Sequence, residues 1–172
     1  MGSGKTTVGQ ALARRLGCPF VDLDARIEQG VRCSIAEIFE LKGEGAFREL
    51  EHRELRAALD EAGGAPAVVA LGGGAFVHNQ NRRLIEQAGG TTVWLDAPVK
   101  ILLERCAGPS GARPLAGDRR RFLRLYRQRL PFYARAGLRV DATAPPENVV
   151  QQILACLAES AKSKVQSPKP ES

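Results

Sequence analysis

The sequence predicts an α/β fold in which helices cover both faces of a parallel sheet. Short apolar stretches alternate along the chain with longer segments whose apolar residues recur at helical spacing. A glycine-rich stretch opens the first helical segment, and three consecutive glycines follow the apolar stretch 67–71. When strands alternate with helices in this way, each helix returns the chain to the same edge of the sheet, so the strands run parallel.

The first residues predict a phosphate-binding loop. Gly2 and Gly4 let the backbone turn tightly, so that consecutive N–H groups can point at one anion. Lys5 adds a positive charge near the outer phosphates of a nucleotide, and the Thr6 hydroxyl is suited to Mg²⁺. Only the second half of the G-x-x-x-x-G-K-[ST] pattern is present, since its first glycine would precede Met1. A chance glycine-rich start is the alternative for this stretch alone.

The helix that follows covers residues 8–16, and a short strand is expected at 20–24. Asp22 and Asp24 lie near the end of that strand, on the same side because strand residues alternate between faces. Two carboxylates are unusual in a buried parallel strand, so this spacing indicates a functional site. The alternative is that Asp24 only caps a helix at 25–30.

The next helical stretch divides in two. Ser34 begins a capping box and a helix that ends near Gly43, and a longer helix covers 44–61. Arg48 and Glu51 are three residues apart on that helix. Taken alone, they predict a surface ion pair that contributes a few tenths of a kcal/mol.

Three glycines, Gly72, Gly73 and Gly74, follow the strand 67–71 directly. One glycine would be enough to turn the chain, so three indicate that a ligand or another part of the backbone approaches closely. In an open α/β sheet, ligands bind at the carboxyl ends of the strands.

Further along, helices are expected at 79–88, 98–105 and 121–136 and from Pro145 onwards, with strands at 91–95 and 138–140. The segment 107–119 has no apolar period and several Gly and Pro residues, which predicts a mobile loop long enough to be a lid. Residues 1–160 are predicted to form one domain, with a substrate-binding region at about 25–62. The Ser-, Lys- and Pro-rich tail 161–172 is predicted to be disordered.

The composition is that of an ordinary globular protein, with 44% hydrophobic and 26% charged residues. No apolar run is long enough to cross a membrane, and no secretory signal is present. The four cysteines are widely spaced, which favours reduced thiols in a cytoplasmic protein over disulfides or a zinc site. Much of the net charge of +6 comes from arginines between Arg113 and Arg139, a segment suited to a phosphorylated or anionic ligand or to nucleic acid.

Six short motifs, in this order and at compatible spacings, resemble those of shikimate kinases, and the resemblance runs from Met1 to about Leu157. They are Gly-Ser-Gly-Lys-Thr-Thr at 2–7, Asp22-Leu23-Asp24, Phe47-Arg48-x-x-Glu51, Leu71-Gly72-Gly73-Gly74-Ala75, Arg113-Pro114-Leu115 and Arg129-x-Pro-x-Tyr133. The resemblance implies a three-layer P-loop kinase fold with a five-stranded parallel sheet, a lid and a small substrate-binding region. It also implies an enzyme that uses ATP to phosphorylate the 3-hydroxyl of shikimate to shikimate 3-phosphate, on the pathway to chorismate and aromatic amino acids.

The resemblance also assigns roles to individual residues. It implies ATP binding by Gly2, Ser3, Gly4, Lys5, Thr6, Thr7, Arg105 and Arg113, with Mg²⁺ held by Thr6 and, through water, by Asp22. It implies shikimate binding by Asp24, Arg48, Gly72, Gly73, Gly74 and Arg129, the two arginines pairing with the carboxylate. Lys5, Asp24 and Arg113 are the implied catalytic residues, and Asp24 would orient or deprotonate the attacking hydroxyl. The expected partners are shikimate and ATP, without nucleic acid or membrane, and the expected form is a monomer with one Mg²⁺.

The sequence departs from the family's pattern at its start and beside Arg105. Family members begin with a hydrophobic strand that enters the glycine loop at the centre of the sheet, and this strand is missing here. Without it, two neighbouring strands would have unpaired backbone, which favours a start site upstream of Met1. Arg105 resembles the family's adenine-stacking arginine, but Cys106 replaces the usual Thr beside it. The alternatives are a related small-molecule kinase, such as a gluconate kinase, and a nucleotide- or nucleic-acid-binding protein without activity.

Overall fold

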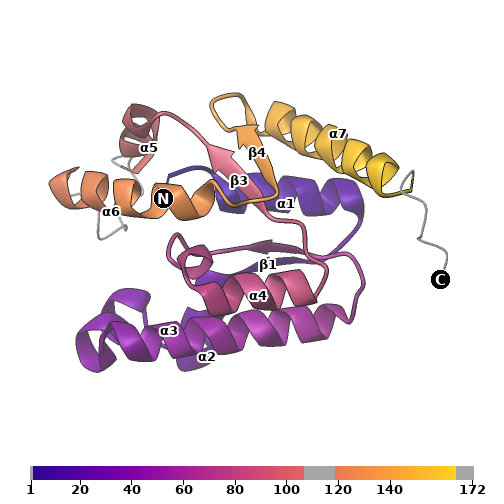
Figure 1. Ribbon diagram of the computed structural model, residues 1–172. Coiled ribbons are helices and arrows are strands. Elements are labelled where there is room, and N and C mark those ends of the chain that lie inside the picture. Colours follow the sequence, from indigo (N-terminus) through magenta and orange to yellow (C-terminus); the bar gives the residue numbers. More distant parts are fainter. Residues whose placement is uncertain (1, 107–118, 166–172) are drawn as a thin grey trace.

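Four parallel strands form two separate pairs in the computed structural model, which describes residues 2–106 and 119–165 (Figure 1). β1 (Phe20–Asp22) pairs with β2 (Val68–Ala70), and β3 (Val93–Asp96) pairs with β4 (Leu138–Asp141). Phe20 lies opposite Val68, and Val93 lies opposite Leu138. The parallel direction confirms the fold class that the alternation of strands and helices predicts.

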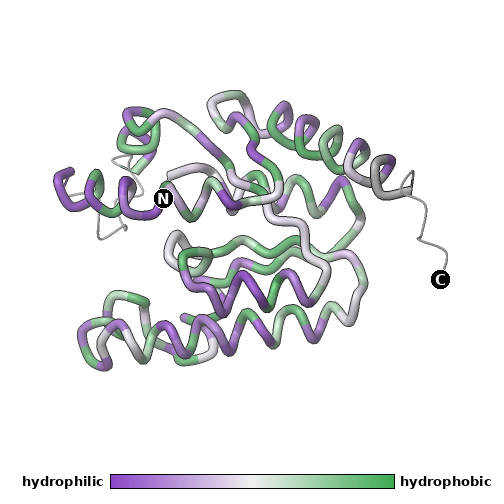
Figure 2. The backbone as a smooth tube through the Cα atoms, in the orientation of Figure 1, coloured by the Kyte–Doolittle hydropathy of each residue, from purple (hydrophilic) through white to green (hydrophobic). Residues whose placement is uncertain are grey.

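Helices cover both faces of the strands. Because neighbouring residues of a strand point to opposite faces, the side chains of one strand pack against helices on both sides. Val68 of β2 packs against the cluster formed by α1 (Lys5–Leu16) and α7 (Pro146–Val165). Its neighbour Val69 packs against the opposite cluster, to which α2 (Leu23–Val31), α3 (Ile35–Ala62) and α4 (Asn79–Gln87) contribute. Figure 2 shows the hydrophobic β1–β2 segments lying between these helices.

A third cluster joins α5 (Val99–Cys106) to α6 (Arg119–Tyr133). Phe122 of α6 is completely buried there against Leu102 and Cys106 of α5. Among the helices that the structure describes, none is long and apolar enough to cross a membrane.

The two strand pairs are not hydrogen-bonded to each other within the described residues. A cavity of about 500 Å³ lies between them, lined by residues that include Val69 and Ala70 of β2, Trp94 and Leu95 of β3, and Leu12 of α1. The inner edges of β2 and β3 therefore lack a partner strand in these residues.

Several predicted boundaries need correction. The strand expected at 20–24 ends at Asp22, and α2 begins at Leu23, so Asp24 belongs to a helix and is not its cap. Asp22 is the cap instead, because its carboxylate accepts hydrogen bonds from the backbone N–H groups of Asp24 and Ala25.

Other boundaries agree with the sequence or extend it. The break expected near Gly43 is present, since this residue interrupts the helical backbone of α3 with φ of 77°. A 3-10 turn, η1 (Ala75–Val77), was not predicted, and α6 begins two residues earlier than expected. Helix α7 continues to Val165, so residues 161–165 are helical although they were expected in the disordered tail. The expected lid at 107–119 lies almost entirely outside the described residues, as does the rest of the tail.

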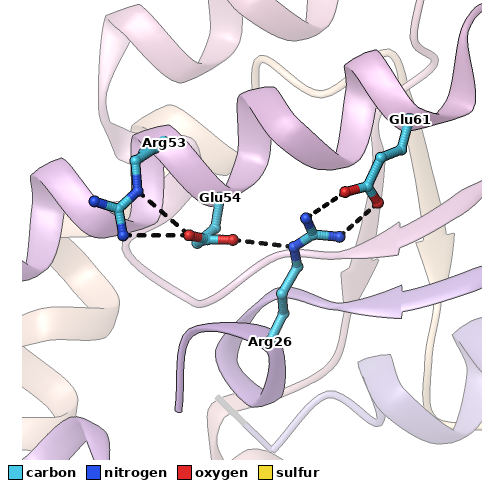
Figure 3. A network of polar contacts seen from close by, with 4 residues as sticks. All are labelled: Arg26, Arg53, Glu54 and Glu61. Carbon is cyan, nitrogen blue, oxygen red and sulfur yellow. Dashed lines mark hydrogen bonds and ion pairs between the residues drawn. The ribbon is translucent and has the colours of Figure 1, made fainter. Parts of the chain in front are cut away.

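A polar network holds α2 against α3 (Figure 3). The guanidinium of Arg26 donates one hydrogen bond to Glu54, at 3.1 Å, and two to Glu61, at 2.7 and 2.6 Å. Arg53 contacts the other oxygen of Glu54 from the solvent side. Because Arg26 follows Asp24 by two residues, this network helps to place the start of α2 relative to α3.

Candidate active site

The glycine loop has the backbone that an anion site needs. Gly2 and Gly4 have φ of 67° and 84°, which favours glycine at both positions. A side chain at Gly2 would also collide with α5, because its Cβ would lie 2.5 Å from the carbonyl oxygen of Leu102. Gly4 is the N-cap of α1, so the N-terminus of this helix directly follows the loop. Such an N-terminus favours a phosphate group through its N–H groups and its dipole.

Thr6 and Asp22 lie together at this helix end. The Thr6 hydroxyl donates a 2.7 Å hydrogen bond to Oδ2 of Asp22, while Oδ1 of Asp22 caps α2. One hydroxyl and one carboxylate are the kind of hard oxygen ligands that Mg²⁺ takes in addition to water and phosphate oxygens. The donor set therefore fits Mg²⁺, with Asp22 held in place by its second role as a helix cap.

Asp24 is the half-buried carboxylate of this region. Burial raises the pKa of Asp24 above its ordinary value, the positive charge of Lys5 opposes the rise, and the nearby carboxylate of Asp22 adds to it. A carboxylate with a raised pKa accepts a proton or a hydrogen bond from a hydroxyl more readily than an exposed one. The structure thus brings Lys5, Asp22 and Asp24 into electrostatic contact.

Two of the three glycines after β2, Gly72 and Gly74, lie directly against side chains from the helices. A Cβ on Gly72 would lie 2.5 Å from Oδ1 of Asp24 and 3.2 Å from Oε1 of Glu51. A Cβ on Gly74 would lie 2.5 Å from both terminal nitrogens of Arg48. The sequence predicted the close approach of a ligand or of backbone; in the structure it is side chains that approach, and they bring Asp24 and Arg48 to the same glycine turn.

Arg48 is held by two carboxylates of very different exposure. Its Nη1 donates to Glu51 at 2.8 Å, and its Nη2 donates to Glu44 at 3.0 Å. The Glu51 side chain is only 1% exposed, whereas that of Glu44 is 66% exposed. The interpretation of Arg48 and Glu51 as a surface ion pair is therefore wrong. A signal for burial was present in the sequence, because Glu51 lies one helical turn from both Phe47 and Leu55 on the buried face of α3.

The pKa values of this pair reflect its burial. Burial raises the pKa of Glu51, although the charge and hydrogen bond of Arg48 oppose the rise and Asp24 adds to it. Burial by itself disfavours the charged form of Arg48, but the two glutamates outweigh it and raise the pKa of Arg48. Arg48 therefore remains a guanidinium cation beside the glycine turn.

The last contributions come from α6. Arg129 is close enough to influence the pKa values of Glu51 and His78, so it faces the same region as Arg48. Tyr133 donates a 2.6 Å hydrogen bond to the carbonyl oxygen of Gly73. Tyr133 belongs to one of the six motifs, but no role was predicted for it or for His78.

The predicted ATP-binding residue Arg105 makes a contact at another part of the chain. Nη1 of Arg105 donates to the carbonyl oxygen of Ala142, at 2.9 Å, in the loop after β4. Arg105 therefore lies beside that loop. Arg113 lies outside the described residues.

Comparison with known proteins agrees with this geometry. The family model described as shikimate kinase matches residues 1–158. The chain is 45% identical over 163 residues to the shikimate kinase of Ruegeria pomeroyi, covering 92% of this chain and 81% of that protein.

Solved structures give the same result for the fold. The shikimate kinase of Acinetobacter baumannii, solved in complex with shikimate, superposes with a TM-score of 0.83 at 34% identity, covering 93% of this chain and 89% of the other. A gluconokinase from Sinorhizobium meliloti gives a TM-score of 0.61 at 24% identity over 98% of this chain and 93% of the other. That second likeness concerns the fold alone.

Proposed function

The chain belongs to the shikimate kinase family, and we propose that it transfers the γ-phosphoryl group of ATP to the 3-hydroxyl of shikimate. The observation that carries this proposal is the meeting of Asp24 and Arg48 at one glycine turn, where Gly72 faces the carboxylate and Gly74 faces the guanidinium. Shikimate has a carboxylate and hydroxyl groups, so a site with one cation and one hydroxyl acceptor matches it.

The arginines would bind the carboxylate end of the substrate. Arg48 and Arg129 belong to different helices, and both charges act on Glu51. A planar guanidinium can donate to both oxygens of a carboxylate, which a lysine cannot do in the same geometry. Glu51 would keep Arg48 in place, and Gly73 and Gly74 would let the ring lie against the backbone.

Asp24 would then hold the hydroxyl that attacks ATP. Phosphoryl transfer depends mainly on in-line placement and on positive charge around the transferred group. The backbone of residues 2–4 and the Lys5 side chain would hold the outer phosphates next to α1, with Thr7 in the same stretch. Mg²⁺, held at Thr6 with Asp22, would neutralise phosphate charge when bound.

The remaining assignments extend the same proposal. Arg113 would reach the transferred phosphate, and Arg105 would contact the nucleotide from beside the loop after β4, where it already binds the carbonyl of Ala142. We further propose one Mg²⁺ per chain, a monomer, one domain over residues 1–160 and a cytoplasmic location with no nucleic acid or membrane partner.

The test measures ADP release from MgATP with shikimate, with gluconate and with no acceptor. The chain of 172 residues is compared with one lengthened before Met1 by an apolar strand. Release that depends on shikimate, and falls sharply in Lys5→Ala, supports the proposal. A folded, ATP-binding protein that responds only to gluconate, or to neither acceptor, refutes it.

A further inference from the structure

The turn that carries the three glycines is held by side chains from two helices. Its backbone carbonyl groups accept hydrogen bonds from Asn81 and Arg82 of α4 and from Tyr133 of α6. The acceptors are Gly73, at 2.6 Å from Tyr133, Ala75, at 2.9 Å from Asn81, and Phe76 and Val77, at 2.8 and 2.6 Å from Arg82. Side chains therefore hold the turn at Gly73 and from Ala75 to Val77. Among the described residues, Tyr133 is the contribution of α6 to these bonds.

Tyr133 differs from the other two partners because of its second contact. Arg129 lies one helical turn before it on α6, and its guanidinium is close enough to act on the Tyr133 hydroxyl through charge and hydrogen bonding. Burial raises the pKa of Tyr133, while the charge and hydrogen bond of Arg129 act in the opposite direction. The phenol is thus neutral at physiological pH, with one proton to donate and lone pairs to accept.

These two contacts define the direction of the hydrogen bonds. A carbonyl oxygen can only accept, so the Tyr133 proton goes to Gly73. A guanidinium can only donate, so a hydrogen bond between the two side chains runs from Arg129 to the oxygen of Tyr133. The hydroxyl therefore stands between a cation and a carbonyl group that would otherwise attract each other.

We propose that Tyr133 is a positioning residue, whose hydroxyl sets the location of Arg129 relative to the glycine turn so that Arg129 remains directed at the substrate carboxylate. This inference rests on the proposed function, in which Arg129 and Gly73 both contact shikimate. Without the hydroxyl, Gly73 has a free carbonyl oxygen, and Arg129 is drawn to it in competition with the substrate.

The experiment removes the hydroxyl and keeps the ring. In Tyr133→Phe the ring contact with Trp94, at 6.3 Å between centroids, can persist, and Asn81 and Arg82 still hold the turn. Tyr126→Phe is the matched control, because Tyr126 belongs to the same helix and its hydroxyl has no hydrogen bond with the described residues.

The expected result is a rise of roughly tenfold in the KM for shikimate in Tyr133→Phe, the size of one lost hydrogen bond to a charged group. The kcat, the KM for ATP and the unfolding temperature should stay close to those of Tyr126→Phe. In an Arg129→Ala background, the additional effect of Tyr133→Phe should disappear, since the tyrosine then has no arginine to place.

Other outcomes overturn the inference. A shikimate KM within twofold of the control shows that the hydroxyl does not place Arg129. A fall in unfolding temperature with both KM values raised shows a structural role only, as does full additivity with Arg129→Ala. If the unmodified chain and its lengthened form have no shikimate-dependent activity, the proposed function fails first, and this inference fails with it.

Discussion

Removal of Arg48 should destabilise the protein mainly through the carboxylate that it leaves behind. Glu51 is 1% exposed and accepts a 2.8 Å hydrogen bond from Arg48. In Arg48→Ala this carboxylate has lost its partner in a buried position. The same variant also lacks one of the two proposed ligands of the shikimate carboxylate, so stability and binding must be measured separately.

The magnitude follows from the exposure of the two partners. Removing one partner of a buried ion pair lowers the free energy of unfolding by about 3–5 kcal/mol. An exposed pair contributes about 0–1 kcal/mol. At about 2–4 °C per kcal/mol for a chain of this size, Arg48→Ala should unfold roughly 6–20 °C below the unmodified protein. Glu44→Gln, which removes the partner that is 66% exposed, should change the unfolding temperature by only a few degrees.

A second substitution separates the buried charge from the lost arginine. Glu51→Gln in the Arg48→Ala background replaces the carboxylate by a neutral amide, and it should recover about 2 kcal/mol of the loss. Because burial raises the pKa of Glu51, the single variant should also lose stability as the pH rises through that pKa, and the double variant should not.

The assay is thermal and urea unfolding followed by far-ultraviolet circular dichroism between pH 5 and 8. If the double variant recovers stability but not shikimate binding, the loss of stability comes from the buried Glu51 carboxylate and the loss of binding from the missing Arg48 guanidinium. The reasoning is refuted if Arg48→Ala is no less stable than Glu44→Gln, or if the double variant is no more stable than the single one.

Three further results are expected. Asp24→Asn should stop turnover yet raise the unfolding temperature at pH 7. Because the pKa of Asp24 is raised in the fold, the protein loses stability as the pH rises through that pKa, and a neutral amide avoids this loss. An unchanged unfolding temperature would contradict the burial argument. Arg26→Met should lower the unfolding temperature more than Arg53→Met. Arg26 joins α2 to α3, whereas the ion pair of Arg53 is with its neighbour Glu54 on the same helix. Equal effects would show that the network in Figure 3 does not hold the helices together. A chain lengthened by an apolar strand that continues into Gly2 should unfold at a higher temperature and bind less of the apolar dye ANS; equal dye binding would show that the cavity between β2 and β3 stays open.

Much of the fold could be predicted because it depends on local patterns. The alternation of apolar and helical segments predicted the parallel strands, and the single glycine at position 43 predicted the break in α3. Gly2 and Gly4 were recognisable because positive φ angles strongly favour glycine. The motifs also identified the family, which the comparisons confirm.

The end of the first strand shows where local patterns are insufficient. Asp22 and Asp24 were both placed on a strand, but a strand and the first turn of a helix are equally compatible with this short sequence. The helix begins earlier because the carboxylate of Asp22 caps it while also accepting a hydrogen bond from Thr6, 16 residues away. The choice between the two aspartates therefore depends on a contact that spacing alone does not reveal.

By itself, the sequence determined which residue types are available for the chemistry: a glycine loop with a lysine, paired aspartates, three consecutive glycines, and arginines. Only the tertiary structure decided how they are held. It placed Glu51 inside the protein, where the loss of its partner Arg48 leaves a buried carboxylate without an ion pair. It also brought the hydroxyl of Tyr133 to the carbonyl of Gly73, across 60 residues of chain. Such contacts are decided by how the helices pack on the sheet, because burial and long-range hydrogen bonds depend on neighbours that are distant in sequence.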